Sequence, residues 1–221
     1  MNESSLPERY AQLLQRIDAA RTTAAVHLLA VAKHQPAAAV RALYALGQRD
    51  FGENYVQEAQ AKQQELADLD GLVWHFIGPL QRNKTAAVAE HFSWVHSLDR
   101  LILAQRLSAQ RPPAQAPLQV CLQVNISDED SKSGCAPADV AALAAAVREL
   151  PNLRLRGLMA IPAPDDQGAF QRLAELQAQL NAQGYALDTL SMGMSADLEA
   201  AIAAGATWVR VGTALFGPRK P

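Results

Sequence analysis

Residues 27–54, HLLAVAKHQPAAAVRALYALGQRDFGEN, contain a complete strand–helix–strand unit. The apolar run HLLAVAK (27–33) has the length and composition of a buried strand. The Ala- and Leu-rich segment PAAAVRALYALG (36–47) has the composition of a helix, and its last residue is Gly47, a type common where helices stop. A second short run, RDFGEN (49–54), follows it. A strand that returns through a helix to another strand indicates a parallel sheet.

The same alternation continues along the rest of the chain. The further strand-like runs are LVWHFIG (72–78), SWVHSLD (93–99), LQVCLQVN (118–125), LRLRGLMAI (153–161), LDTLSMGM (187–194) and TWVRVGTALFG (207–217). The helical segments among them are NYVQEAQAKQQELADL (54–69), DRLILAQRLSAQ (99–110), PADVAALAAAVRELP (137–151), QGAFQRLAELQAQLNAQG (167–184) and SADLEAAIAAG (195–205). Eight such units match a (β/α)8 TIM barrel.

A doubly wound open sheet is the alternative for this alternation, but no GxGxxG or GxxxxGK[ST] motif follows the first strand-like run. Residues 111–117, with three prolines, look like a loop rather than an interdomain linker. We therefore predict an α/β fold with one (β/α)8 barrel domain over residues 1–221. An extra amphipathic helix should precede it, since apolar residues recur at helical spacing after a possible Ser4 or Ser5 cap: Leu6, Tyr10, Leu13, Leu14 and Ile17.

The composition narrows the function classes. Twenty basic and 22 acidic side chains give a net charge of −2, which does not favour binding to nucleic acid or to an acidic membrane surface. Cys121 and Cys135 have neither disulfide-framework nor zinc-site spacing. The polar N-terminal stretch lacks the pattern of a secretory signal, and no run is apolar enough to cross a bilayer, so we expect a cytoplasmic protein.

Unusual polar residues fall at the ends of the strand-like runs, where a barrel of this kind carries its site. Lys33 closes the first run, and the strand period of two puts it on one face with Leu29 and Val31. Burial lowers the pKa of a lysine, and the neutral amine can attack an aldehyde. The alternative is a solvated lysine in the loop that follows the strand.

Two donor-rich segments follow the seventh and eighth runs. In SMGMSADLEAAI (191–202), Ser195 can cap a helix that begins near Ala196 and presents free N–H groups to a phosphate. Gly212 and Thr213 offer an N–H and a hydroxyl after the last strand, and barrels often bind phosphate with these two loops. The alternative for the first segment is a capped turn without a ligand. Arg210 can contact a phosphate or a ring nitrogen, or it can pair with a carboxylate.

Two further runs carry polar residues at or near their ends: Asn54 closes the second run, and His75 lies near the end of the third. A histidine inside an apolar strand is more often a core residue than a catalyst, so these two are expected to line the site at most. The three tryptophans, Trp74, Trp94 and Trp208, are expected to pack in the core.

Seven motifs in order resemble the pyridoxal 5′-phosphate (PLP) homeostasis protein family, whose fold is similar to the N-terminal barrel of alanine racemase. They are AVAK (30–33), FGENYVQE (51–58), HFIGPLQRNK (75–84), VNISDEDSKSG (124–134), RGLMAIP (156–162), SMGMSADLEAAI (191–202) and VRVGTALFG (209–217). The resemblance implies that PLP is the cofactor and that Lys33 holds it as a Schiff base. It further implies phosphate contacts from Ser195, Gly212 and Thr213 beside Met194, an Arg210 that faces the pyridine nitrogen, and a lining that includes Asn54 and His75.

The function implied by the resemblance is that of a carrier or buffer, which takes up PLP and delivers it to apo-enzymes. We expect no enzyme activity, because the second, β-rich domain of barrel-type racemases, with its opposing tyrosine, has no counterpart after the eighth unit. Without that dimerising domain we also expect a monomer. Two alternatives stay open: a PLP-dependent amino-acid racemase of weak activity, and a cofactor-free Schiff-base aldolase acting on a phosphorylated sugar.

Overall fold

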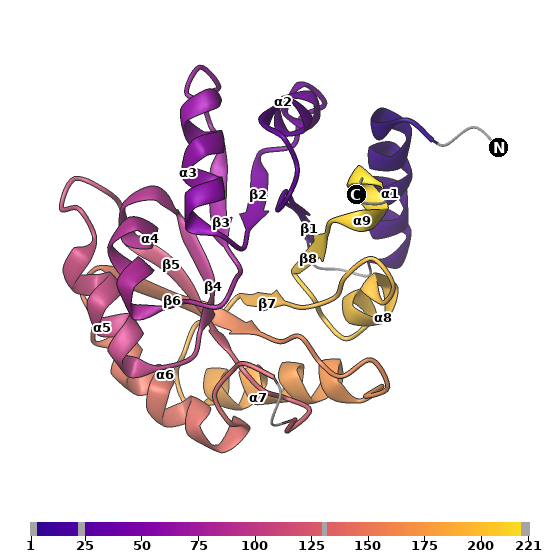
Figure 1. The fold of residues 1–221 in the computed structure, drawn as a ribbon. Coiled ribbons are helices and arrows are strands. Elements are labelled where there is room, and N and C mark those ends of the chain that lie inside the picture. The colour runs from indigo at the N-terminus through magenta and orange to yellow at the C-terminus, as the bar shows by residue number, and fades with distance from the viewer. Residues whose placement is uncertain (1–3, 22–24, 130–131, 218–221) are drawn as a thin grey trace.

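A computed structural model describes residues 4–21, 25–129 and 132–217. Within these ranges eight parallel strands form a closed barrel in the order β1 to β8, and helices surround it (Figure 1). The strands are β1 (His27–Val31), β2 (Asp50–Glu53), β3 (Val73–Phe76), β4 (Trp94–Leu98), β5 (Leu118–Gln123), β6 (Leu153–Met159), β7 (Thr189–Ser191) and β8 (Trp208–Val211). The barrel closes because β1 pairs with β8, with His27 opposite Trp208 and Ala30 opposite Val211.

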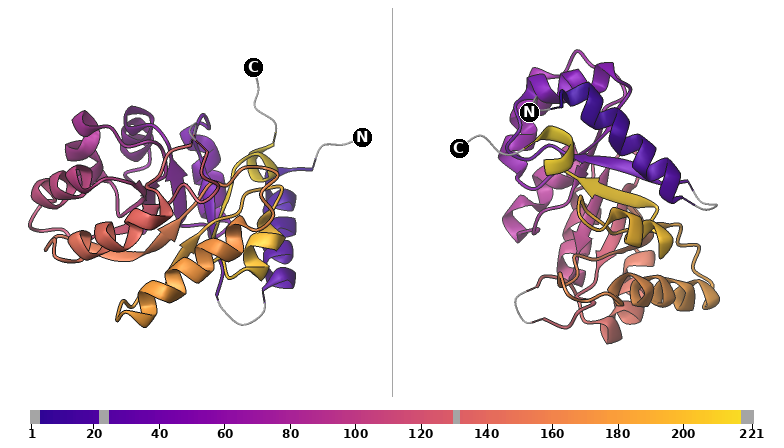
Figure 2. Two further views of the ribbon diagram at one scale, coloured as in Figure 1. Left: turned by 90° about the horizontal axis from the view of Figure 1, so that it is seen from below. Right: turned by 90° about the vertical axis from the view of Figure 1, so that its right-hand side faces the viewer.

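In the described residues, helices connect consecutive strands on the outside of the barrel, one further helix precedes the first strand and another follows the eighth (Figures 1 and 2). The α-helices are α1 (Leu6–Ala20), α2 (Ala37–Ala45), α3 (Val56–Glu65), α4 (Thr85–His91), α5 (Leu101–Gln110), α6 (Val140–Arg148), α7 (Ala169–Ala182), α8 (Leu198–Ala203) and α9 (Thr213–Phe216). Two 3₁₀ turns, η1 (Arg82–Lys84) and η2 (Pro137–Asp139), lead into α4 and α6.

The predicted (β/α)8 barrel is confirmed, and the open doubly wound sheet is wrong. Each strand-like run contains one observed strand, and residues 111–117 form a loop between α5 and β5. Helix α4 was not predicted, because its seven residues, TAAVAEH, are too few to show a helical period. Gly47 and Gly205 end their helices with φ of 101° and 100°, values that favour glycine.

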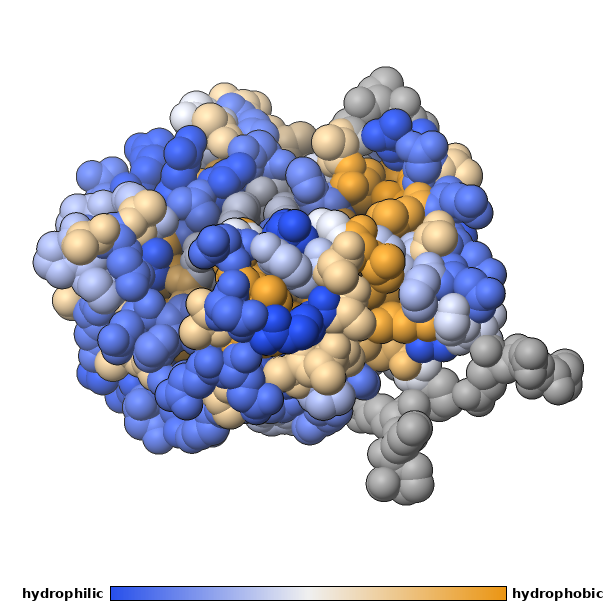
Figure 3. Space-filling model, turned by 90° about the horizontal axis from the view of Figure 1, so that it is seen from above, coloured by the Kyte–Doolittle hydropathy of each residue, from blue (hydrophilic) through white to orange (hydrophobic). Residues whose placement is uncertain are grey.

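The main hydrophobic core lies between the barrel and its helices. Strand residues such as Leu28, Phe51 and Val95 point outward and pack against helix residues such as Val40 and Leu103. The inside of the barrel holds instead a small separate cluster of Trp94, Cys121 and Met159, together with polar side chains described below. Trp74 belongs to the outer core. Figure 3 shows that the outer surface on one face is largely hydrophilic, with a narrower strip of hydrophobic residues.

Helix α1 is the predicted extra helix. Ser5 caps it, since its hydroxyl accepts from the Glu8 N–H and the Glu8 carboxylate accepts from the Ser5 N–H. Its buried face carries Tyr10, Leu13 and Ile17, whereas Leu14, which we expected on that face, is 41% exposed. The helix packs against α8 and α9, so the first described helix lies beside the last (Figures 1 and 2).

Candidate functional site

A cavity of about 340 Å³ opens at the carboxyl ends of six strands, which is the end of such a barrel that carries function. Its lining residues are Val31, Lys33, Gln35, Asn54, Ile77, Ile161, Met194, Ser195, Ala196, Arg210, Gly212, Thr213 and Gly217. Seven of the eight predicted site residues are among them, and the exception is His75. The structure therefore brings together residues from the first and the last strand of the chain.

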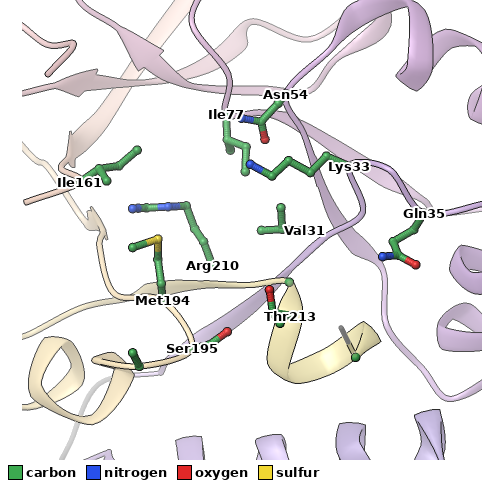
Figure 4. Close-up of a pocket in the computed structure, with 13 residues that line it drawn as sticks. Val31, Lys33, Gln35, Asn54, Ile77, Ile161, Met194, Ser195, Arg210 and Thr213 are labelled. Carbon is green, nitrogen blue, oxygen red and sulfur yellow. The ribbon is translucent and has the colours of Figure 1, made fainter. Parts of the chain in front are cut away.

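Lys33 lies two residues beyond β1, in the turn that leads to α2. Its partly buried side chain reaches into the cavity near Asn54 and Ile77 (Figure 4). Val31 lines the same cavity, as the strand period of two predicts. The structure thus places Lys33 at the cavity rather than in a fully solvated loop.

Ser195 and Thr213 lie close together, on the opposite side of the cavity from Asn54 (Figure 4). The prediction that Ser195 caps a helix is wrong: α8 begins at Leu198 after Asp197, and the Ser195 hydroxyl accepts from the main-chain N–H of Ala214 at 3.4 Å. The hydroxyl bonds to α9 because residues 195–197 form a turn that carries it away from the start of α8. The loops after β7 and β8 are therefore joined at the cavity.

Helix α1 supports both of these loops from outside the cavity. The Arg16 guanidinium donates to the main-chain oxygen of Ser195 at 3.3 Å and pairs with Glu199 at 2.8 Å. Arg9 donates to the main-chain oxygen of Leu215, in α9, at 2.8 Å. The extra N-terminal helix therefore positions the two donor-rich loops.

Arg210 is a buried cation at the cavity. It comes from β8, is 5% exposed, and donates to the main-chain oxygens of Ser191 at 2.5 Å and Ala160 at 2.8 Å. It also donates to the Ser191 hydroxyl at 2.9 Å. Burial lowers the pKa of Arg210 to about 10, so the side chain stays charged at neutral pH. Because these partners are neutral oxygens, its positive charge remains available to a ligand.

His75 does not line the cavity, contrary to our prediction. It is fully buried inside the barrel, where it stacks on Trp94 with ring centroids 5.5 Å apart. Its Nε2 lies 3.0 Å from the Asp50 carboxylate and its Nδ1 lies 2.9 Å from Nε2 of His96. The middle of β3 points its side chain to the barrel axis below the cavity, so His75 is a core histidine with satisfied partners.

A chain of hydrogen bonds nevertheless connects His75 to the cavity. Nδ1 of His96 lies 2.7 Å from the Ser191 hydroxyl, which in turn accepts from Arg210. Burial lowers the pKa of both His75 and His96. The pKa of His96 falls well below its usual value, because the neighbouring His75 and the charged Arg210 also disfavour a protonated His96. Both rings are therefore neutral. Sequence reasoning missed Asp50, His96 and Ser191, although the strand period places His96 on the same inward face as Trp94.

Several apolar residues of the cavity were also missed. Ile77 follows His75 by two residues and Ile161 ends the sixth strand-like run, so the same period points to both of them. Met194, which was predicted, is 42% exposed and lines the cavity next to Ser195. These side chains supply the apolar walls that a flat aromatic ring requires.

Other features bear on chemistry less directly. Cys121 is buried and Cys135 is partly buried, both as free thiols, and burial raises the pKa of Cys135 to about 11. Across the described ranges, no group of three or more His, Cys, Asp or Glu residues is arranged to hold a metal ion. None of the helices described is both long enough and apolar enough to span a bilayer.

The residues present fit the cofactor that the resemblance implies. Oδ1 of Asn54 is buried at the cavity and finds no hydrogen-bond partner among the described residues. Leaving such an acceptor unsatisfied costs about 1–3 kcal/mol, so a ligand that donates a hydrogen bond there is favoured. PLP has a ring hydroxyl that can do so, an aldehyde for the amine of Lys33, and a phosphate for the hydroxyls across the cavity.

Comparison with known proteins gives consistent matches over nearly the whole chain. The family model described as "Alanine racemase, N-terminal domain" matches residues 6–220. A "Pyridoxal phosphate homeostasis protein" of Pseudomonas aeruginosa is 63% identical, over 98% of this chain and 96% of the relative. A protein of the same name from Escherichia coli K12 is 51% identical, over 98% and 97%.

Solved structures agree with these matches. The structure of PipY from Synechococcus elongatus PCC7942 with PLP bound has a TM-score of 0.86 and 43% identity, over 96% of this chain and 100% of that one. Alanine racemase from Corynebacterium glutamicum has a TM-score of 0.73 at 16% identity, over 98% of this chain and 61% of that one. At that identity the second likeness concerns the fold alone.

Proposed function

Because this chain belongs to the pyridoxal phosphate homeostasis protein family, with the barrel of the alanine racemase N-terminal domain, we propose that it binds PLP in the cavity at the end of the barrel and acts in PLP homeostasis. The observation that carries the proposal is that Lys33, Ser195, Arg210 and Thr213 share one cavity. We take residues 1–221 to form one PLP-binding domain.

Each residue has a distinct role in this proposal. Nζ of Lys33 condenses with the aldehyde of PLP, so a C=N bond replaces the C=O bond and the oxygen leaves as water. Ser195, Gly212 and Thr213 bind the phosphate, while Met194 and the apolar walls contact the ring. Oδ1 of Asn54 accepts a hydrogen bond from the ring hydroxyl of PLP. Arg210 faces the pyridine nitrogen, and its fixed positive charge keeps that nitrogen unprotonated.

We propose that the protein is a carrier rather than an enzyme. When bound, PLP supplies an electron sink, but racemisation of an amino acid also needs groups that remove and return a proton on opposite faces of it. Among the described lining residues, the ionisable side chains are Lys33 and Arg210. Arg210 stays charged near neutral pH, so Lys33 is the one group there suited to proton transfer. This supports a protein that holds PLP with its aldehyde bound as an imine on Lys33. PLP would be released to an apo-enzyme by transimination, in which an amine of that enzyme replaces Lys33 in the imine.

The decisive experiment is the visible spectrum of the protein with PLP, before and after borohydride. We expect a yellow protein, and after reduction the mass of the cofactor on Lys33. Lys33→Ala should abolish the band, whereas Lys84→Ala, outside the cavity, should leave it unchanged. An unaltered band in Lys33→Ala would show that the lysine is wrong.

A second assay separates the carrier from the racemase. The loaded protein is mixed with an apo PLP-dependent enzyme, and separately with single enantiomers of several amino acids in deuterated water. We expect transfer of PLP and negligible deuterium incorporation. Racemisation at enzyme-like rates that disappears in Lys33→Ala would reject the carrier. We further propose a cytoplasmic monomer, which size-exclusion chromatography with light scattering tests for the oligomeric state.

A further inference from the structure

The turn that carries Lys33 is held on both sides by helix α3. On one side, Nζ of Lys62 donates to the main-chain oxygen of Ala32 at 2.6 Å. On the other, the Glu58 carboxylate accepts from the main-chain N–H of His34 at 2.5 Å. Both flanking peptide groups of Lys33 are thus bonded to side chains of one helix, which belongs to the next βα unit.

The turn needs such support, because His34 has a left-handed backbone with φ of 61°. A residue with a Cβ is strained in that region, and such strain persists only where the surrounding contacts hold it. The His34 ring also lies 5.3 Å from that of Tyr55, just before α3. The direction in which Lys33 leaves the turn therefore depends on these contacts.

The two side chains that hold the turn belong to an ionic cluster in which Glu53 and Lys62 are buried and Glu58 is partly buried. Nζ of Lys62 lies 2.6 Å from Oε1 of Glu53 and 2.7 Å from Oε1 of Glu58. Lys62 is 5% exposed and Glu53 is fully buried. A buried ammonium is tolerated when it is paired and hydrogen-bonded, as it is here by two carboxylates and one carbonyl. We call Glu53, Glu58 and Lys62 the α3 clasp.

We propose that the α3 clasp is a positioning device for Lys33, which fixes the turn so that Nζ enters the cavity at the place where the aldehyde of PLP is held. The inference rests on the proposed function, since it concerns how fast the bound aldehyde is captured. Glu58 and Lys62 contact the peptide groups beside Lys33 and are not among the cavity-lining residues, so they act through Lys33.

The test separates the reaction of Lys33 with the aldehyde of PLP from the binding of the ring and phosphate of PLP. Pyridoxine 5′-phosphate has the same ring and phosphate but an alcohol in place of the aldehyde, so its affinity reports the cavity alone. The rate of appearance of the imine band at saturating PLP reports the placement of Lys33. In Glu58→Ala we expect that rate to fall about tenfold or more, because small misplacements of a reacting group are costly, while the affinity for pyridoxine 5′-phosphate stays within about twofold.

Two further variants control this result. Glu58→Gln keeps an oxygen for the His34 N–H and should restore most of the rate. Glu65→Ala removes an exposed carboxylate from the same helix and should behave as the wild type. If Glu58→Ala does not fold, Lys62→Met takes its place, because it removes the donor to the Ala32 oxygen. The same fall in the rate of imine formation is expected, with the affinity for pyridoxine 5′-phosphate kept.

An unchanged rate in Glu58→Ala and in Lys62→Met would overturn the proposal. So would a parallel loss of affinity for pyridoxine 5′-phosphate, because the contacts would then support the cavity as a whole. Failure of the proposed function looks different: the wild-type protein itself would show no imine band with PLP.

Discussion

The guanidinium of Arg210 donates to the hydroxyl of Ser191 over 2.9 Å. That hydroxyl lies 2.7 Å from Nδ1 of His96, and the chain continues through His75 to the Asp50 carboxylate. Arginine is always a donor and an ionised carboxylate always an acceptor. The arrangement that satisfies every group therefore runs in one direction, with Ser191 donating to His96, His96 to His75, and His75 to Asp50.

Ser191→Ala should destabilise the fold, because it removes the partner of a fully buried ring nitrogen. We expect a loss of about 1–3 kcal/mol in the free energy of unfolding, the usual cost of a buried polar group without a partner. Urea denaturation measures it, with the exposed Ser4→Ala as the control. A loss of less than about 0.5 kcal/mol in the free energy of unfolding lies in the range of ordinary surface substitutions. Such a loss would mean that the Ser191 hydroxyl is not needed to satisfy the buried His96 ring.

The two buried histidines should make stability fall in acid. Burial lowers the pKa of His75 and His96, so both stay neutral in the folded protein while the unfolded chain binds protons as pH falls through about 6.5. The unfolded state then gains more protons, and the free energy of unfolding falls by up to about 1.4 kcal/mol per pH unit for each histidine.

Glu53 acts in the opposite direction, because burial raises its pKa although Lys62 pairs with it. A raised pKa in the folded state makes stability fall as pH rises above the usual titration range of a glutamate. The wild type is for that reason compared with His96→Gln, by urea denaturation between about pH 5 and pH 8. We expect the wild type to lose more stability than the variant below about pH 6.5. Parallel curves would contradict a neutral, buried His96.

The hydroxyls of Ser195 and Thr213 should distinguish PLP from pyridoxal. The double variant Ser195→Ala/Thr213→Ala removes two donors to a charged phosphate, each worth about 1.5–3 kcal/mol, so we expect at least a tenfold weaker affinity for PLP. The affinity for pyridoxal, which lacks the phosphate, should change less. Equilibrium titration followed by the imine band measures both. Equal losses for the two ligands would show that the hydroxyls do not face a phosphate.

The strands could be predicted because each is a short apolar run between glycine or polar residues and helical segments. The same pattern placed Lys33 and Arg210 at the ends of their strands, where the cavity opens. The chain from His75 to Ser191 could not be predicted, because it joins side chains of different strands across the barrel interior. The capping role given to Ser195 failed for a related reason: its hydroxyl bonds to α9, which sequence spacing does not bring near.

Pairing of β1 with β8 has a consequence for biosynthesis. During translation the amine of Lys33 leaves the ribosome well before Arg210 and Thr213 do. A nascent chain therefore contains the lysine proposed to form the imine before it contains the residues proposed to bind the phosphate. The proposed PLP cavity is lined by residues that follow both β1 and β8, so we expect chains that lack β8 to bind the free aldehyde weakly.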